Sequence, residues 1–83
     1  MADEIIEIGE DVEVEVVFDE DGMPVGAIVD DLVVATSESG SVIDETIDVL
    51  DADGNLVLED EIVSVFDADG NLVAVEETIT TID

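Results

Sequence analysis

Residues 49–57 read VLDADGNLV and residues 65–73 read VFDADGNLV, so one turn sequence occurs twice along the chain. The surrounding segments, 45–60 and 61–76, are identical at nine of sixteen positions. In each copy an Asp-Gly step provides a tight turn, because glycine adopts a positive φ without a steric clash at Cβ. Each copy therefore predicts a strand, a tight turn and a second strand.

A fainter third copy occupies residues 13–28, where Val17, Asp19, Asp21, Gly22 and Val25 fall in register. A looser turn is predicted over residues 36–41, because Ser, Thr and Gly residues cluster there. Together these turns divide the chain into a meander of hairpins.

Apolar and acidic residues alternate over Val12–Val16, which is typical of a strand with one apolar face and one carboxylate face. No segment repeats apolar residues at the spacing of an amphipathic helix, and β-branched residues disfavour helix. The sequence therefore predicts an all-β fold. Further runs that we expect to form strands are Glu4–Ile8, Val25–Asp30, Leu32–Thr36, Thr46–Leu50, Ile62–Phe66, Leu72–Val75 and Thr78–Ile82.

The length of 83 residues fits a single small domain over residues 1–83, with a thin core. A sheet of this size with one acidic face needs cover for its apolar face, and the sequence offers no helix for that purpose. A small closed or partly open β-barrel would cover the apolar face and remove the open edges. We therefore expect the meander of Asp-Gly hairpins to close on itself.

The composition is that of a restricted alphabet. Asp and Glu number 26 whereas Lys, Arg and His are absent, so the formal net charge is −26. Cys, Gln, Trp and Tyr are missing as well. A total absence of basic side chains indicates a rule imposed on the residue choice, as in a designed protein or an engineered simplification of a natural domain. An extremely acidic natural protein is the alternative.

The charge also determines which partners we expect. A hydrophobic content of 47% argues against a disordered acidic tail, and cations, salt or protons should offset the repulsion in the native state. Metal cations or polyamines are therefore expected partners, whereas nucleic acid is not, because its phosphates would meet like charge.

No apolar run is long enough for a membrane span, and the acidic N-terminus is unlike a signal peptide. We expect a soluble chain, cytoplasmic if it is expressed in a cell.

The three Asp-x-Asp-Gly turns favour loose cation binding over an EF-hand. With the turn glycine at position 6 of such a loop, position 1 falls on Val17, Val49 or Val65, so the first oxygen ligand is missing. We expect hairpin turns whose carboxylates attract calcium or magnesium without specificity, and no required cofactor. The predicted metal-binding residues are Asp19, Asp21, Asp51, Asp53, Asp67, Asp69 and Glu76, the last of which takes position 12 of the third loop.

Catalysis is not expected. The only aromatic residues, Phe18 and Phe66, occupy equivalent repeat positions and are interpreted as core residues rather than as a platform for a sugar ring. The serines have no His or Lys to activate them as nucleophiles. We therefore predict that the chain is not an enzyme.

Residues 17–34, VFDEDGMPVGAIVDDLVV, resemble the opening of the PRC-barrel family. In that family an Asp-Gly step is followed by a second glycine and an alternating Val/Ile strand, and Asp21, Gly22 and Gly26 fall on this spacing. Residues 49–54 and 62–70 are similar to the family's later strands, so the resemblance covers about residues 16–77. It implies a small β-barrel that serves as a non-catalytic docking module.

Two interpretations of the function stay open. The first is a designed or simplified hyperacidic β-barrel that folds under a restricted alphabet, with cations as structural partners and no catalytic activity. The alternative is a natural acidic interaction module, for example a nucleic-acid mimic that occupies the basic groove of a partner.

Overall fold

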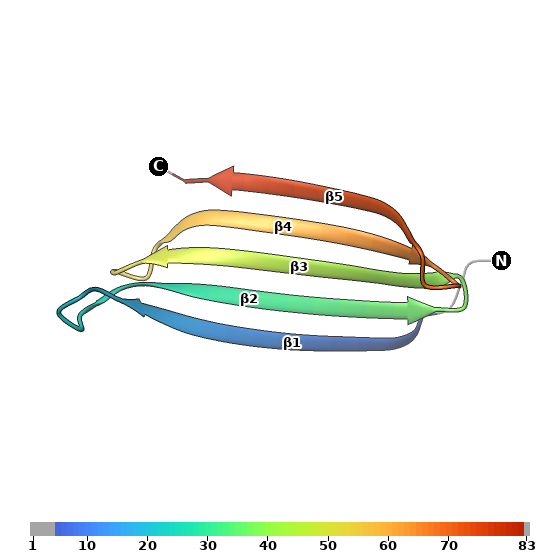
Figure 1. Ribbon diagram of the computed structural model, residues 1–83, viewed down its shortest axis with the longest axis horizontal. Helices are drawn as coiled ribbons and strands as arrows, with labels where there is room; N and C mark the ends of the chain where they lie inside the picture. Colours follow the sequence, from blue (N-terminus) through green and yellow to red (C-terminus); the bar gives the residue numbers. More distant parts are fainter. Residues whose placement is uncertain (1–4, 83) are drawn as a thin grey trace.

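The protein forms one five-stranded antiparallel sheet whose strands follow the order of the sequence (Figure 1). The computed structural model describes residues 5–82. Each strand contacts only its neighbours in the sequence, so the predicted all-β meander is confirmed. Within the described range no helix is long and apolar enough to cross a membrane. The strands are β1 (Ile5–Phe18), β2 (Pro24–Ser37), β3 (Gly40–Asp51), β4 (Leu56–Asp67) and β5 (Leu72–Thr81).

Several runs that the sequence indicated as separate strands are continuous in the structure. Val25–Asp30 and Leu32–Thr36 together form β2. β1 likewise joins the predicted runs Glu4–Ile8 and Val12–Val16, although Glu4 itself lies outside the described residues. β5 joins Leu72–Val75 with most of Thr78–Ile82. The acidic residues between the runs, such as Asp31, therefore lie in the middle of long strands instead of ending them.

Three turns share one geometry. In the β3–β4 turn, Asp51 accepts a hydrogen bond from the amide of Gly54 at 3.0 Å and donates its own amide to the carbonyl of Asn55 at 2.9 Å. The turns that begin at Asp19 and Asp67 repeat both bonds. The strand register shifts beside each of these turns, as in a β-bulge. The turn glycines Gly22, Gly54 and Gly70 have φ values of 81°, 85° and 86°, a conformation that side chains with a Cβ rarely adopt.

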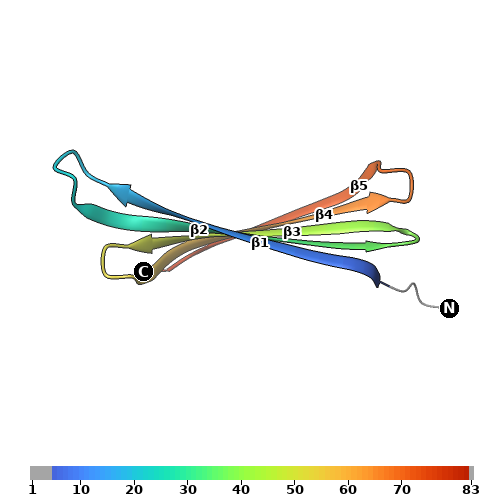
Figure 2. The same cartoon turned by 90° about the horizontal axis from the view of Figure 1, so that it is seen from below.

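The sheet is a single twisted layer, as Figure 2 shows along its edge. None of the side chains that the structure describes is buried. The radius of gyration is 16.4 Å, whereas a compact domain of this length would have about 12 Å. The thin core expected from the sequence is therefore not present in the part of the chain that the structure describes.

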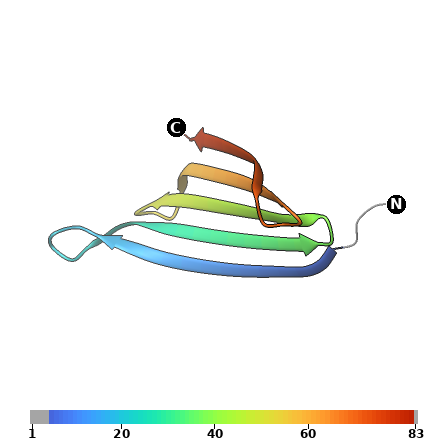
Figure 3. The same ribbon diagram turned by 45° about the vertical axis from the view of Figure 1, so that its right-hand side comes forward.

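The sheet is also open, because β1 and β5 lie at opposite edges and do not pair (Figure 3). The closure expected from the sequence is not formed in this structure. Successive residues of a strand face opposite sides of a sheet, so acidic residues near the strand centres place carboxylates on both faces. Closure would enclose one set of these carboxylates in a narrow interior, where unpaired charges are costly.

Two glycines within strands provide a test of the strand register. A Cβ added at Gly26 would lie 2.5 Å from the carbonyl oxygen of Leu50, whereas a Cβ added at Gly9 meets nothing within 4 Å. We expect Gly26→Ala to lower the free energy of unfolding by about 1–3 kcal/mol. Gly9→Ala should leave it unchanged or raise it by about 0.5–1 kcal/mol. Urea denaturation in 1 M NaCl compares the two variants, and equal effects would contradict the pairing of β2 with β3.

Candidate functional site

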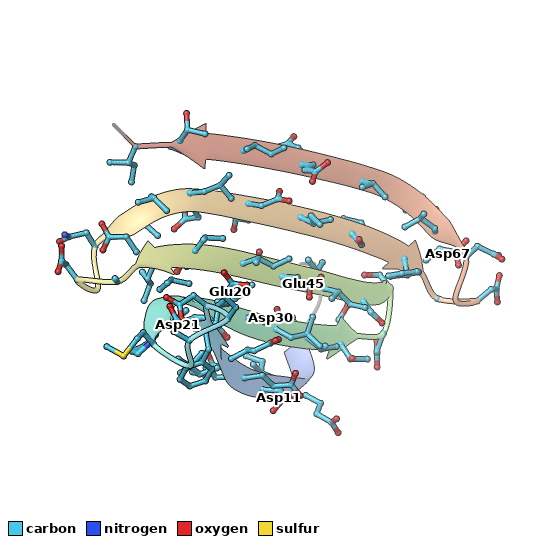
Figure 4. All side chains as sticks on the ribbon, turned by 60° about the vertical axis from the view of Figure 1, so that its left-hand side comes forward. Asp11, Glu20, Asp21, Asp30, Glu45 and Asp67 are labelled. Atoms are coloured by element: carbon cyan, nitrogen blue, oxygen red, sulfur yellow. The ribbon has the colours of Figure 1, made fainter. Side chains whose placement is uncertain are left out.

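Each strand carries two adjacent acidic residues near its centre, and each pair sends one carboxylate to either face of the sheet. Because the meander aligns the strand centres, these carboxylates form an acidic belt across each face, perpendicular to the strands. Figure 4 labels Asp11, Asp30 and Glu45, which lie on β1, β2 and β3 in one of the belts. The five adjacent pairs are Glu10-Asp11, Asp30-Asp31, Asp44-Glu45, Asp60-Glu61 and Glu76-Glu77.

The two belts differ slightly in size, because Glu13, Asp48 and Glu59 add to the five pairs. Faces are assigned from the strand register, since directly opposed residues share a face. Belt 1 consists of Glu10, Asp31, Asp44, Asp48, Glu59, Glu61 and Glu76. Belt 2 consists of Asp11, Glu13, Asp30, Glu45, Asp60 and Glu77. We call the corresponding sides of the sheet face 1 and face 2.

Two carboxyl groups placed to share a hydrogen bond face each other across every boundary between neighbouring strands. Asp48 and Glu59 are directly opposed on β3 and β4, and the other pairs are diagonal neighbours in the register. An ionised carboxylate can only accept a hydrogen bond, so one member of each pair must carry a proton for the bond to form. The pairs are Glu10–Asp31, Asp30–Glu45, Asp48–Glu59, Asp44–Glu61 and Asp60–Glu77.

These contacts change the acidity of the glutamates. The hydrogen bond with Asp31, followed by repulsion between the two carboxylates, raises the pKa of Glu10 above its ordinary 4.5. Hydrogen bonds to aspartates on the neighbouring strands likewise raise the pKa of each of the four other glutamates of the pairs. Because the folded pKa is raised, the stabilisation is fully present below pH 4.5 and is lost as the pH rises through the folded value.

The belts also contain oxygen atoms without a partner. One side-chain oxygen, Oδ1, of each of five belt aspartates is inaccessible to water and accepts no hydrogen bond. Such an atom is unfavourable unless a proton or a cation satisfies it. The five residues are Asp30, Asp31, Asp44, Asp48 and Asp60.

A hollow of about 550 Å³ lies beside belt 2, where β1 meets β2. Its lining consists of Glu13, Val14, Glu15, Ile28 and Asp30. Glu13, Glu15 and Asp30 give this hollow an acidic lining beside the apolar side chain of Ile28.

The first aspartate of each of the three turns is engaged by its own backbone. Oδ1 of Asp51 accepts the amides of Asp53 and Asn55, both at 2.9 Å, and the turns at Asp19 and Asp67 repeat this arrangement. The amide of Asn55 is the main cause that lowers the pKa of Asp51 below 3.8, and Asp67 is lowered in the same way. This contribution to stability is present above pH 3.8 and is lost as the pH falls through the folded value.

The structure distributes the predicted metal ligands over separate places. Glu76 lies in belt 1 at the centre of β5, opposite Val63, and not at the third turn. Among the residues described, no three acidic side chains are arranged to hold one metal ion together, so cation binding at the turns stays a prediction. Asp19, Asp21, Asp51 and Asp53 lie at one end of the sheet, and Asp67 and Asp69 lie at the other end (Figure 1).

The belts were not predicted from the sequence, although the sequence carries a signal for them. The acidic pairs of β2, β3 and β4 each lie about midway between two consecutive turns, as Asp30-Asp31 does between the turns at 19–23 and 37–40. In an antiparallel meander, residues midway between turns come to the same level of the sheet. The spacing of acidic pairs relative to turns could therefore have indicated both belts.

Comparisons of this chain with protein families, curated proteins and solved structures find no match. The resemblance of residues 17–34 to the PRC-barrel family stays an expectation from the sequence.

The carboxyl pairs predict an unusual dependence of stability on pH. We expect the melting temperature to be higher at pH 4.5 than at pH 7 by roughly 5 °C or more, because the paired glutamates lose their protons between these values. A variant with Gln at positions 10, 45, 59, 61 and 77 should lose most of this difference, since an amide donates the hydrogen bond at both pH values.

A matched control removes the same charge outside the belts. It carries Gln or Asn in place of Glu7, Glu15, Glu20, Asp21 and Glu38, and it should keep the pH difference of the parent chain. If the control loses the difference as completely as the belt variant, overall charge and not the carboxyl pairs governs the stability.

Proposed function

We propose that this chain is a designed or simplified, non-catalytic acidic β-sheet module whose native state includes cations or protons along its two belts. The proposal is supported by one observation above all: a carboxyl pair bridges every strand boundary in a chain without a single basic residue. Its role is then to fold within a restricted alphabet, with cations as structural partners. A barrel of the PRC type stays a prediction from the sequence that the open sheet does not support.

Cations suit the belts at neutral pH for a physical reason. When both members of a pair are ionised, their repulsion opposes the backbone hydrogen bonds between the same strands. Calcium takes six to eight oxygen ligands with flexible geometry, including water, and a polyamine presents several ammonium groups along one chain. The carboxylates become neighbours only in the folded sheet, so either ligand favours the folded state over the unfolded one.

The same geometry gives little support to catalysis. Acid–base catalysis by carboxyl groups needs two groups whose environments separate their pKa values, together with a cleft that holds a substrate. The five pairs repeat one environment across an open sheet. The hollow beside Glu13 offers only carboxylates, Val14 and Ile28. We therefore assign the belts a structural role.

The proposal predicts that stability follows the cation supply at pH 7. The Debye length falls from about 30 Å at 0.01 M salt to about 3 Å at 1 M, so the melting temperature should rise steeply over this range. Calcium at 5 mM or spermine at 1 mM should raise it as well, at concentrations where screening alone has little effect. Identical melting temperatures in all four buffers would contradict the proposal.

Two variants with equal charge distinguish the belts from the turns. Asp31→Asn, Asp44→Asn and Asp60→Asn together remove three belt carboxylates, and Asp21→Asn, Asp53→Asn and Asp69→Asn together remove three turn carboxylates. We expect the first variant to lose most of the rise in melting temperature caused by calcium and the second to keep it. The reverse result would place the cations at the turns, as the sequence alone predicted, and would contradict binding along the belts.

A further inference from the structure

Face 1 presents an apolar row along β1, in which Glu10 of belt 1 is the one acidic residue between Ile8 and Val16. Four apolar side chains of β1 point to this face and are exposed, with exposed fractions of 63% for Ile8, 53% for Val12, 64% for Val14 and 46% for Val16. On β2 the apolar residues of face 1, such as Val29, are smaller or partly covered. On β3 to β5 the same face carries most of belt 1.

The opposite face of β1 is different. Apart from Gly9 and Val17, the residues of β1 that share face 2 are acidic between positions 7 and 17. The four exposed apolar side chains Ile8, Val12, Val14 and Val16 can therefore be covered from face 1 alone. We call the row Ile8, Val12, Val14 and Val16 the β1 stripe.

We infer that face 1 is a docking surface for a cationic amphipathic α-helix of a protein partner, with apolar residues on the β1 stripe and Lys or Arg residues over belt 1. This inference goes beyond the proposed function, because small cations can neutralise belt 1 but cannot cover the β1 stripe.

The dimensions of the surface suit a helix. Neighbouring strands are about 4.8 Å apart, so a helix of about 10 Å diameter covers β1 and β2. It crosses belt 1 at Glu10 and Asp31 and leaves the rest of belt 1, on β3 to β5, at its flank. The stripe from Ile8 to Val16 is about 27 Å long, which corresponds to a helix of about 18 residues. A helix in this position would also cover the edge strand β1, one of the ways in which proteins protect an open edge.

Charge complementarity selects the partner. A second copy of this chain would add another 26 negative charges and would bring one acidic belt towards another. A helix with Lys and Arg on one flank supplies the charge that the chain lacks, and the long side chains extend from an apolar stripe to neighbouring carboxylates. The surface therefore fits a cationic partner and opposes self-association.

A synthetic peptide tests the inference on the parent chain without any substitution. The probe is an 18-residue Leu/Lys peptide with Leu on one helical face, and its control is a scrambled peptide of the same composition. Isothermal titration calorimetry is done in 5 mM CaCl₂ and 150 mM NaCl, with circular dichroism to follow peptide helix. We expect one-to-one binding that induces helix, and binding at least tenfold weaker for the scrambled peptide. Equal affinity for both peptides would overturn the inference, because it would show attraction by charge alone.

Variants locate the peptide on the sheet. Val12→Thr, Val14→Thr and Val16→Thr together should weaken binding of the amphipathic peptide about tenfold or more. The control, Val73→Thr, Val75→Thr and Ile79→Thr, changes residues of the opposite edge strand with similar exposed fractions of 60%, 56% and 60%, and should change binding less than twofold. Circular dichroism checks that both variants remain folded. Equal losses in the two variants would contradict docking on the β1 stripe.

Sedimentation velocity of the chain alone in the same buffer tests whether a second copy of the chain occupies the β1 stripe instead of a partner helix. A dimer that the β1-stripe variant abolishes would assign the stripe to a second copy and overturn the inference. Failure of the proposed function is distinguishable from this result, because it would appear as melting temperatures that do not respond to cations, whatever the peptide does.

Discussion

Repulsion between carboxylates on neighbouring strands is the constraint on which this structure depends. The backbone brings the strand centres into register, and the sequence places acidic pairs at those centres, so strand pairing and charge repulsion act at the same positions. No basic residue is available to relieve the conflict. Only a shared proton, a bound cation or screening by salt can do so.

The same constraint explains why the protein is a single open layer. A two-layer fold or a closed barrel must remove one face of a sheet from water, and each face here carries a row of carboxylates at its middle. The apolar residues on both sides of a belt, such as Val33 and Val29 around Asp31, cannot be covered without covering the belt as well. A partner that supplies positive charge at the belt and apolar groups beside it would satisfy both requirements.

The local structure was predictable where the sequence has local causes. The turns at 51–55 and 67–71 follow from Asp, Gly and Asn at fixed positions, and the structure shows the hydrogen bonds that these residues make. The strand content and the meander order follow from the β-branched runs and the turns between them. Each run was expected to be a separate strand, however, which left Asp31 and Glu76-Glu77 between strands.

The candidate site depends on register, which the sequence analysis did not determine. Whether Glu45 lies beside Asp30 depends on how β2 and β3 align, and the alignment is fixed by the turn at 37–40 and by the close approach of Gly26 to Leu50. The closed barrel was expected because one face was taken to be apolar. Alternation within strands instead divides each acidic pair between both faces.

The most direct measurement is an NMR titration of the side-chain carboxyl carbons of the folded chain in low salt without divalent cations. Glu10, Glu45, Glu59, Glu61 and Glu77 should titrate above their ordinary pKa of 4.5, and Asp51 and Asp67 should titrate below 3.8. Titration of the five glutamates at or below 4.5 would show that the carboxyl pairs do not form, and protons would then have no structural role in the belts.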